Sequence, residues 1–122
     1  MSVLTSYVGT FNSKVITSTT TEAGADVVYT VPPNFSAELT FLICANGGAS
    51  SSKVSVLVYH ADDATYNYLI REHSVGGHDT YAVIESSRIF LHPGDKIVAY
   101  KDSGSFDVSL SGKQYYNTVR NL

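Results

Sequence analysis

Residues 81–112 constrain the fold most, because they consist of short apolar stretches divided by turn signals. Residues 81–84, 88–91 and 96–101 are rich in β-branched and aromatic side chains, and Pro93-Gly94 separates the last two. Such stretches, cut by turn residues, are typical of antiparallel strands in a sandwich or barrel. The run therefore predicts an all-β architecture, and it supplies no catalytic group.

The same pattern extends over most of the chain. We expect strands at residues 27–31, 35–45, 54–58, 66–73, 80–84, 88–91, 96–101 and 106–111. Residues 1–25, rich in Thr and Ser, are expected to form an extended N-terminal arm or the first strands. With about eight to ten strands and no amphipathic helix, the predicted fold is a single antiparallel, jelly-roll-like β-sandwich in which residues 1–122 form one domain.

Two strands carry sharper expectations. In residues 35–45, Leu39, Phe41 and Ile43 are predicted to share one face, with Leu42 and Cys44 on the other, so the strand is central or lies at an interface.

The last run, residues 106–111, alternates cleanly between apolar and polar side chains, which indicates one buried and one solvated face. Pro93-Gly94 suits the two central positions of a type II turn, where glycine accepts a positive φ.

Composition excludes several classes of protein. With 43% hydrophobic and 16% charged residues, the 122-residue chain is globular rather than disordered. The net charge is −3 and the eight Lys and Arg residues are scattered, so no basic stripe is present to bind nucleic acid. The single Cys44 cannot form an internal disulfide, and its apolar surroundings predict a buried core thiol.

No signal peptide and no apolar window long enough to span a membrane are evident. We therefore expect a protein made in a cytoplasm, including that of an infected cell, with no membrane partner.

Residues that could carry chemistry are scattered. The histidines His60, His73, His78 and His92 show no recognised metal-ligand spacing. Asp62-Asp63 is a turn dipeptide, no Gly-x-Ser-x-Gly elbow occurs, and the glycine pairs join strands instead of opening helices. We expect no enzyme activity, no cofactor and no metal.

Tyrosine is the one over-used functional residue, with nine copies and no tryptophan in the chain. Tyrosine combines apolar area with a polar tip, which favours it at protein interfaces and at sugar-binding surfaces. Tyr66, Tyr68, Tyr115 and Tyr116 are the candidate interaction surface. The alternative is that most tyrosines fill the core or its rim.

Four segments resemble small virion proteins of tailed bacteriophages: residues 29–34 (Tyr-Thr-Val-Pro-Pro-Asn), 39–47, 89–97 (with Leu-His-Pro-Gly-Asp) and 107–112. That group has a corner of the form VPAG, an L-x-PGD turn and a closing strand that ends in Ser-Gly. Pro33-Asn34 departs from the commoner Ala-Gly pair. The resemblance implies a non-enzymatic structural protein of the virion, in the capsid, tail or fibre apparatus.

The leading prediction is thus a virion building block that assembles with copies of itself, as a homotrimer or another homo-oligomer, and with other virion proteins. The alternative is a carbohydrate-binding, lectin-like module that recognises a host glycan through Tyr66, Tyr68, Asn67, Asp62 or His60. A third possibility, a cupin-like metalloenzyme, requires the histidines to converge inside a barrel.

Overall fold

The computed structural model describes residues 7–117, and within them the chain forms nine strands and one short 3-10 helix. The strands are β1 (Tyr7–Ile16), β2 (Asp26–Thr30), β3 (Phe35–Asn46), β4 (Ser52–His60), β5 (Thr65–Val75), β6 (Thr80–Ile84), β7 (Ile89–Leu91), β8 (Lys96–Lys101) and β9 (Phe106–Tyr116). The helix, η1 (Glu22–Gly24), precedes β2. No helix in residues 7–117 has the length and apolar character needed to cross a bilayer.

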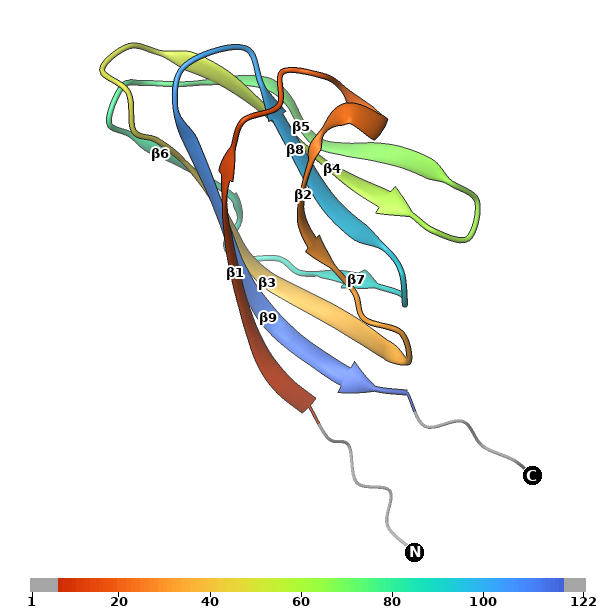
Figure 1. Cartoon of the computed structure of the whole chain (residues 1–122). Helices are drawn as coiled ribbons and strands as arrows, with labels where there is room; N and C mark the ends of the chain where they lie inside the picture. Colours follow the sequence, from red (N-terminus) through yellow and green to blue (C-terminus); the bar gives the residue numbers. More distant parts are fainter. Residues whose placement is uncertain (1–6, 118–122) are drawn as a thin grey trace, which may run out of the picture.

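The strands form two layers (Figure 1). One sheet has the order β1-β9-β3-β6, with β7 also paired to β3, and the other has the order β2-β8-β4-β5. Every pairing is antiparallel. The predicted all-β antiparallel sandwich of about eight to ten strands is therefore confirmed.

Several local predictions can be placed on this framework. The N-terminal region supplies one strand, β1, and the helix η1, whereas the apolar pair Val3-Leu4 lies outside the described residues. Gly76-Gly77 lies in the connection that carries the chain from β5 in one sheet to β6 in the other. β3 is a central strand, flanked by β9 on one side and by β6 and β7 on the other.

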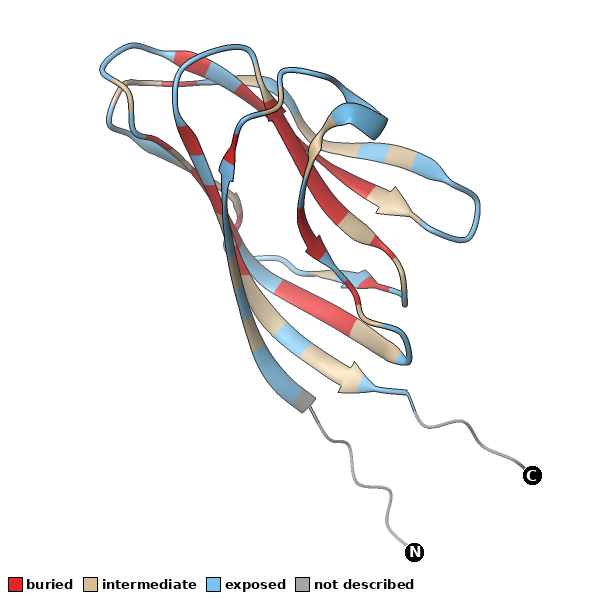
Figure 2. Cartoon of the chain, viewed as in Figure 1, coloured by how far each residue is buried: buried red, intermediate tan, exposed pale blue. Residues whose placement is uncertain are grey.

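The core lies between the sheets, and Figure 2 shows burial concentrated on β3, β4 and β8, while β1 is exposed along most of its length. Phe106, Val108 and Leu110 on β9 are fully buried and Asp107 between them is exposed, which confirms the predicted alternation. Each fully buried side chain of this size contributes roughly 1.5–3 kcal/mol relative to its exposed state. Cys44 is also fully buried, and burial raises the pKa of its thiol to about 12.

The predicted face of Leu39 was wrong. The pairing register of β3 with β9 shifts between Leu39 and Phe41, so Thr40 is the extra residue of a β-bulge. The bulge reverses the alternation of side chains, and Leu39 is consequently buried together with Leu42 while Phe41 is 36% exposed. Apolar residues at both alternating positions concealed this shift in the sequence.

A glycine faces the bulge from the neighbouring strand. Gly112 on β9 is paired with Leu39, and a Cβ atom at Gly112 would overlap the carbonyl oxygen of Glu38 and crowd the Cα atom of Leu39. The close approach of the two backbones therefore requires glycine at this position.

The turn between β7 and β8 is the predicted type II turn. The Asp95 N–H donates to the His92 carbonyl oxygen at 3.0 Å, with Pro93 and Gly94 between them, and Gly94 has a φ of 85°. Positive φ at the second central position is the defining requirement of this turn, and glycine meets it without strain.

A buried carboxylate links this turn to two other connections. Asp95 is 3% exposed, and its Oδ1 accepts the Ala61 N–H at 2.9 Å while its Oδ2 accepts the His92 N–H at 2.9 Å. The backbones of Val31 and this turn also pair, because the Val31 N–H donates to the Asp95 carbonyl and the Gly94 N–H donates to the Val31 carbonyl. Asp95 thus joins the β2–β3, β4–β5 and β7–β8 connections.

Candidate interaction surfaces

Tyr66 and Tyr68 lie on the outer face of the β2-β8-β4-β5 sheet. They pack against Leu57, Val98 and Tyr100, which form a small buried cluster separate from the core between the sheets. Leu57 and Val98 alternate along their strands with side chains of that core, so this sheet is apolar on both faces. The structure thus brings two of the four predicted tyrosines together.

Both tyrosine rings are already engaged within the molecule. The Tyr66 ring lies 4.9 Å from the Tyr59 ring, measured between centroids, and the Arg71 guanidinium carbon lies 4.7 Å from the Tyr68 centroid. The Tyr68 and Tyr100 hydroxyls are 3.1 Å apart, and this hydrogen bond, together with burial, raises the pKa of Tyr68. The two rings are therefore half-buried and fixed by their neighbours.

Tyr115 and Tyr116 lie on the other sheet, at the end of β9. Tyr115 donates its hydroxyl hydrogen to Glu38 Oε1 at 2.9 Å, and Arg88 donates to Glu38 Oε2 at 2.7 Å. The Tyr115 bond, with further help from Arg88, holds the pKa of this buried carboxyl below its usual value. Tyr116 is 58% exposed and contacts Phe35 edge to face. The four tyrosines therefore form two separate groups rather than one surface.

A surface that the sequence analysis missed lies on the outer face of β1, β9 and β3, and we call it the phenylalanine face. Phe11 on β1 and Phe41 on β3 are both paired with Ser111 on β9, so their side chains project from the same face. Val15 on β1 and Phe90 on β7 project from this side as well, according to their pairing registers. The exposed fractions are 68% for Phe11, 67% for Phe90 and 60% for Val15.

One sequence signal could have found part of this face. Phe11, Ser13 and Val15 alternate with Asn12 and Lys14 in a Ser/Thr-rich segment, which indicates a strand with one apolar face. The position of Phe41 on the same face could not be read in this way, because it depends on the bulge in β3.

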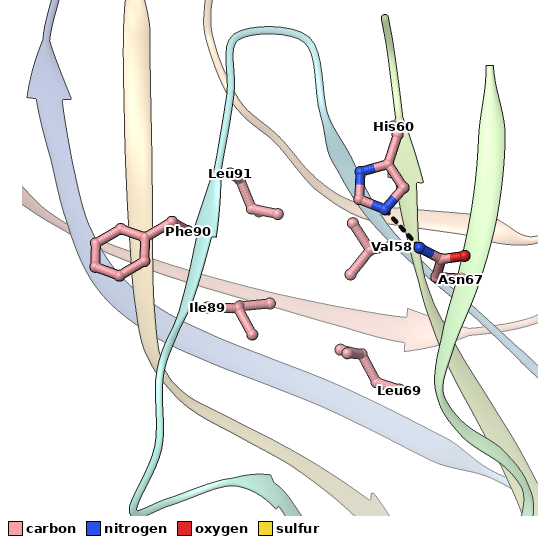
Figure 3. Close-up of a pocket in the computed structure, with 7 residues that line it drawn as sticks. All are labelled: Val58, His60, Asn67, Leu69, Ile89, Phe90 and Leu91. Atoms are coloured by element: carbon pink, nitrogen blue, oxygen red, sulfur yellow. Dashed lines mark hydrogen bonds between the residues drawn. The ribbon is translucent and has the colours of Figure 1, made fainter. Parts of the chain in front are cut away.

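A pocket of about 300 Å³ opens where β7 faces β4 and β5 (Figure 3). It is lined by Val58, His60, Asn67, Leu69, Ile89, Phe90 and Leu91. Figure 3 shows Ile89 and Leu91 on the side of β7 that faces the pocket, whereas the Phe90 ring points to the opposite side.

Only some of the residues predicted for a glycan site line this pocket. His60 and Asn67 line it and are joined by a 2.9 Å contact between Nε2 and Nδ2, but Tyr66 and Tyr68 do not line it. Asp62 lies exposed in the β4–β5 loop. Apart from His60 and Asn67 the lining is apolar, so this pocket offers few of the hydrogen-bonding groups that a sugar requires.

The histidines are spread over the structure. His60 contacts Asn67, and the His73 ring stacks on the Tyr81 ring with centroids 3.8 Å apart. Within residues 7–117, no three His, Cys, Asp or Glu side chains are grouped so that they could hold a metal ion.

Comparison with known proteins finds a likeness among solved structures. No protein-family model matches the sequence, and no curated protein matches it either. Among solved structures, a chain in the acidic stable capsid structure of Helicobacter pylori bacteriophage KHP30 is similar, with a TM-score of 0.54 and 14% sequence identity. The match covers 96% of this chain and 97% of that chain. The likeness shows that the two chains share a fold over nearly their whole length.

Proposed function

We propose that this chain is a non-enzymatic structural protein of a bacteriophage particle and forms part of the capsid. The observation that carries the proposal is the fold shared with a chain of a phage capsid structure, over 96% of this chain and 97% of that chain. Because the shared fold extends over nearly the whole of both chains, the proposed role concerns the chain as a whole. We further propose that residues 1–122 form one domain.

The strand order supports this proposal. We interpret the sheet orders β1-β9-β3-β6 and β2-β8-β4-β5 as those of an eight-stranded jelly roll in which β6 and β7 share one position. Jelly rolls occur in viral capsid proteins, and also in lectins and cupins. The strand order therefore fits a capsid role but does not distinguish it from a lectin or a cupin. The residues on the surface are needed to distinguish these three classes.

The described surface favours assembly over catalysis. Large apolar side chains project from the phenylalanine face, and the two sheets end in the edge strands β1 and β6, and β2 and β5, whose backbone groups invite pairing with another chain. Burial of such faces and edges between rigid subunits would stabilise a shell. We propose that the chain forms a homo-oligomer, a trimer being one arrangement, and contacts other virion proteins.

Carbohydrate binding is the alternative, and the geometry supports it less. Sugar recognition by tyrosine needs an accessible ring face, but Tyr66 packs on Tyr59 and Tyr68 is covered by Arg71. A glycan array tests this alternative directly. Binding that is lost in Tyr68→Ala, with the fold retained, would favour the lectin function over the capsid role.

Quantitative mass spectrometry of gradient-purified particles tests the proposed function. The particles should be those of the bacteriophage whose genome encodes this chain. We expect the chain at a fixed and high ratio to the major shell protein, in every fraction that contains intact particles. Recovery of the chain only in the soluble fraction of the lysate would contradict the proposal.

A further inference from the structure

We propose that the phenylalanine face packs against the same face of a second copy of this chain, about a two-fold axis that runs across the strands. The inference deepens the proposed assembly role and rests on it, because it names the surface and the partner through which the subunits associate.

The face carries large apolar side chains on both sides of a polar central strand. Phe11 is 68% exposed, Val15 is 60% exposed and Phe41 is 36% exposed, and they project from β1 and β3, which flank β9. Single exposed apolar residues are common on protein surfaces, whereas a contiguous group marks an interaction site. We therefore regard this face as one that is covered in the functional protein.

The pairing registers arrange the face in four rows that cross β1, β9 and β3. The rows are Gly9–Lys113–Glu38, Phe11–Ser111–Phe41, Ser13–Ser109–Ile43 and Val15–Asp107–Ala45. Side chains in one row point to the same side of the sheet, because directly paired residues share a face.

These rows are complementary to themselves. Consider a two-fold axis that lies in the plane of the face, at right angles to the strands, and passes between the second and third rows. This axis exchanges the first row with the fourth and the second row with the third. Phe11 of one copy then lies over Ser13 of the other, and Val15 lies over Gly9. A Cβ atom placed on Gly9 would have no neighbour within 4 Å, so the space above Gly9 can accept a side chain. On β1, therefore, each large side chain meets a small one, whereas on β3 the same axis places Phe41 of one copy over Ile43 of the other, an apolar pair.

Charge favours this axis over one that runs parallel to the strands. Lys113 and Asp107 are exposed at opposite ends of the face, and the proposed axis places Lys113 of each copy over Asp107 of the other. An axis parallel to the strands would instead place Lys113 over Lys113 and Asp107 over Asp107. Like charges at such a contact repel each other, so only the axis across the strands brings opposite charges together. Glu38 in the first row is paired with Arg88 and interacts with Lys113 as well, so this end of the face carries two cations and one carboxylate.

The size of the face sets the expected strength. Three strands about 4.8 Å apart and ten residues long cover a flat footprint of about 500 Å². This is less than the roughly 800 Å² per partner of a typical stable interface. We therefore expect a reversible dimer at micromolar concentrations in isolation, which the many copies in a shell would reinforce.

Charge reversal tests the proposed dimer, because two variants that should each be monomeric alone should associate when they are mixed. Lys113→Asp leaves acidic groups at both ends of the face, and Asp107→Lys leaves basic groups at both ends. Each variant alone should be a monomer in low salt, by light scattering after gel filtration, at a concentration where the wild-type chain is dimeric. An equimolar mixture of the two should form a heterodimer, because every contact then joins opposite charges. Glu85→Lys, an exposed reversal in the β6–β7 loop, should leave the wild-type dimer unchanged.

Three results would overturn the inference: a wild-type chain that stays monomeric at several hundred micromolar, single variants that dimerise as the wild type does, or a mixture that stays monomeric. Circular dichroism of each variant establishes that it is folded. Hydroxyl-radical labelling of the wild-type chain needs no variant, and Phe11 and Phe41 should become protected as the concentration rises. Unchanged labelling would also overturn the inference.

The test of dimerisation and the test of the proposed function can succeed or fail independently. If the chain is abundant in particles but the mixed variants do not associate, the proposed function stands and another virion protein covers this face. If the variants associate as expected but the chain is absent from particles, the self-association stands and the capsid role fails.

Discussion

Replacement of Asp95 tests how the three connections at one end of the sandwich are held. In the wild-type protein the Asp95 carboxylate accepts the N–H groups of Ala61 and His92, both at 2.9 Å, from a position that is 3% exposed. Asp95→Ala removes both acceptors and leaves two N–H groups without a partner in a site from which water is largely excluded. Asp95→Asn retains one carbonyl oxygen and replaces the other with a donor.

The expected loss of unfolding free energy follows from these two hydrogen bonds. Hydrogen bonds to a charged group contribute about 1.5–3 kcal/mol each, so Asp95→Ala should lower the free energy of unfolding by about 3–6 kcal/mol. For a chain of this length about 1 kcal/mol corresponds to roughly 4 °C, which predicts a fall in Tm of about 12–24 °C. Asp95→Asn should lower the free energy of unfolding by about half as much as Asp95→Ala.

Urea and thermal unfolding, followed by circular dichroism, measure this effect. Asp62→Ala is the matched control, because Asp62 is exposed in the β4–β5 loop and its replacement should change the free energy of unfolding by no more than about 0.5 kcal/mol. If Asp95→Ala lowers the free energy of unfolding by less than about 1 kcal/mol, Asp95 does not hold the three connections together. Equal losses of unfolding free energy in Asp95→Ala and Asp62→Ala would lead to the same conclusion.

Three further predictions concern the bulge, the thiol and acid stability. Gly112→Ala should destabilise the fold by about 1–3 kcal/mol, since the new methyl group would overlap the Glu38 carbonyl, and an unchanged urea midpoint would contradict this. Cys44 should react with a thiol reagent such as DTNB only after unfolding, because its thiol is buried and its pKa is raised to about 12; rapid reaction of the native protein would count against the buried position. The Lys53 N–H lowers the pKa of Asp102 below its ordinary value of 3.8, so the stability that this carboxylate contributes is present above about pH 4 and is lost as the pH falls further. Asp102→Asn should therefore flatten the acid limb of a plot of unfolding free energy against pH, and an unaltered limb would show that Asp102 is not responsible.

Much of the architecture could be predicted from the sequence because it depends on local patterns. The alternation of Phe106, Val108 and Leu110 gives a strand with one buried face regardless of its neighbours, and Pro93-Gly94 gives the turn through its own backbone preferences. These features are determined by residues that are adjacent in the chain.

The bulge and the surfaces could not be predicted, because they depend on pairing between distant segments. Thr40 is an ordinary strand residue, and only the pairing register of β3 with β9 shows that it bulges. Tyr66 and Tyr68 share a face because they lie two residues apart, but nothing local places Tyr115 on the other sheet. The place of Phe41 on the phenylalanine face could not be predicted for the same reason, whereas the alternation of Phe11 and Val15 on β1 is local.

Imaging of the intact particle at side-chain resolution tests the central claim most directly. We predict that density for this two-sheet sandwich occurs in the symmetric shell of the bacteriophage that encodes the chain, with the outer face of β1, β9 and β3 covered by a second copy. A shell with no density for this fold would contradict the account.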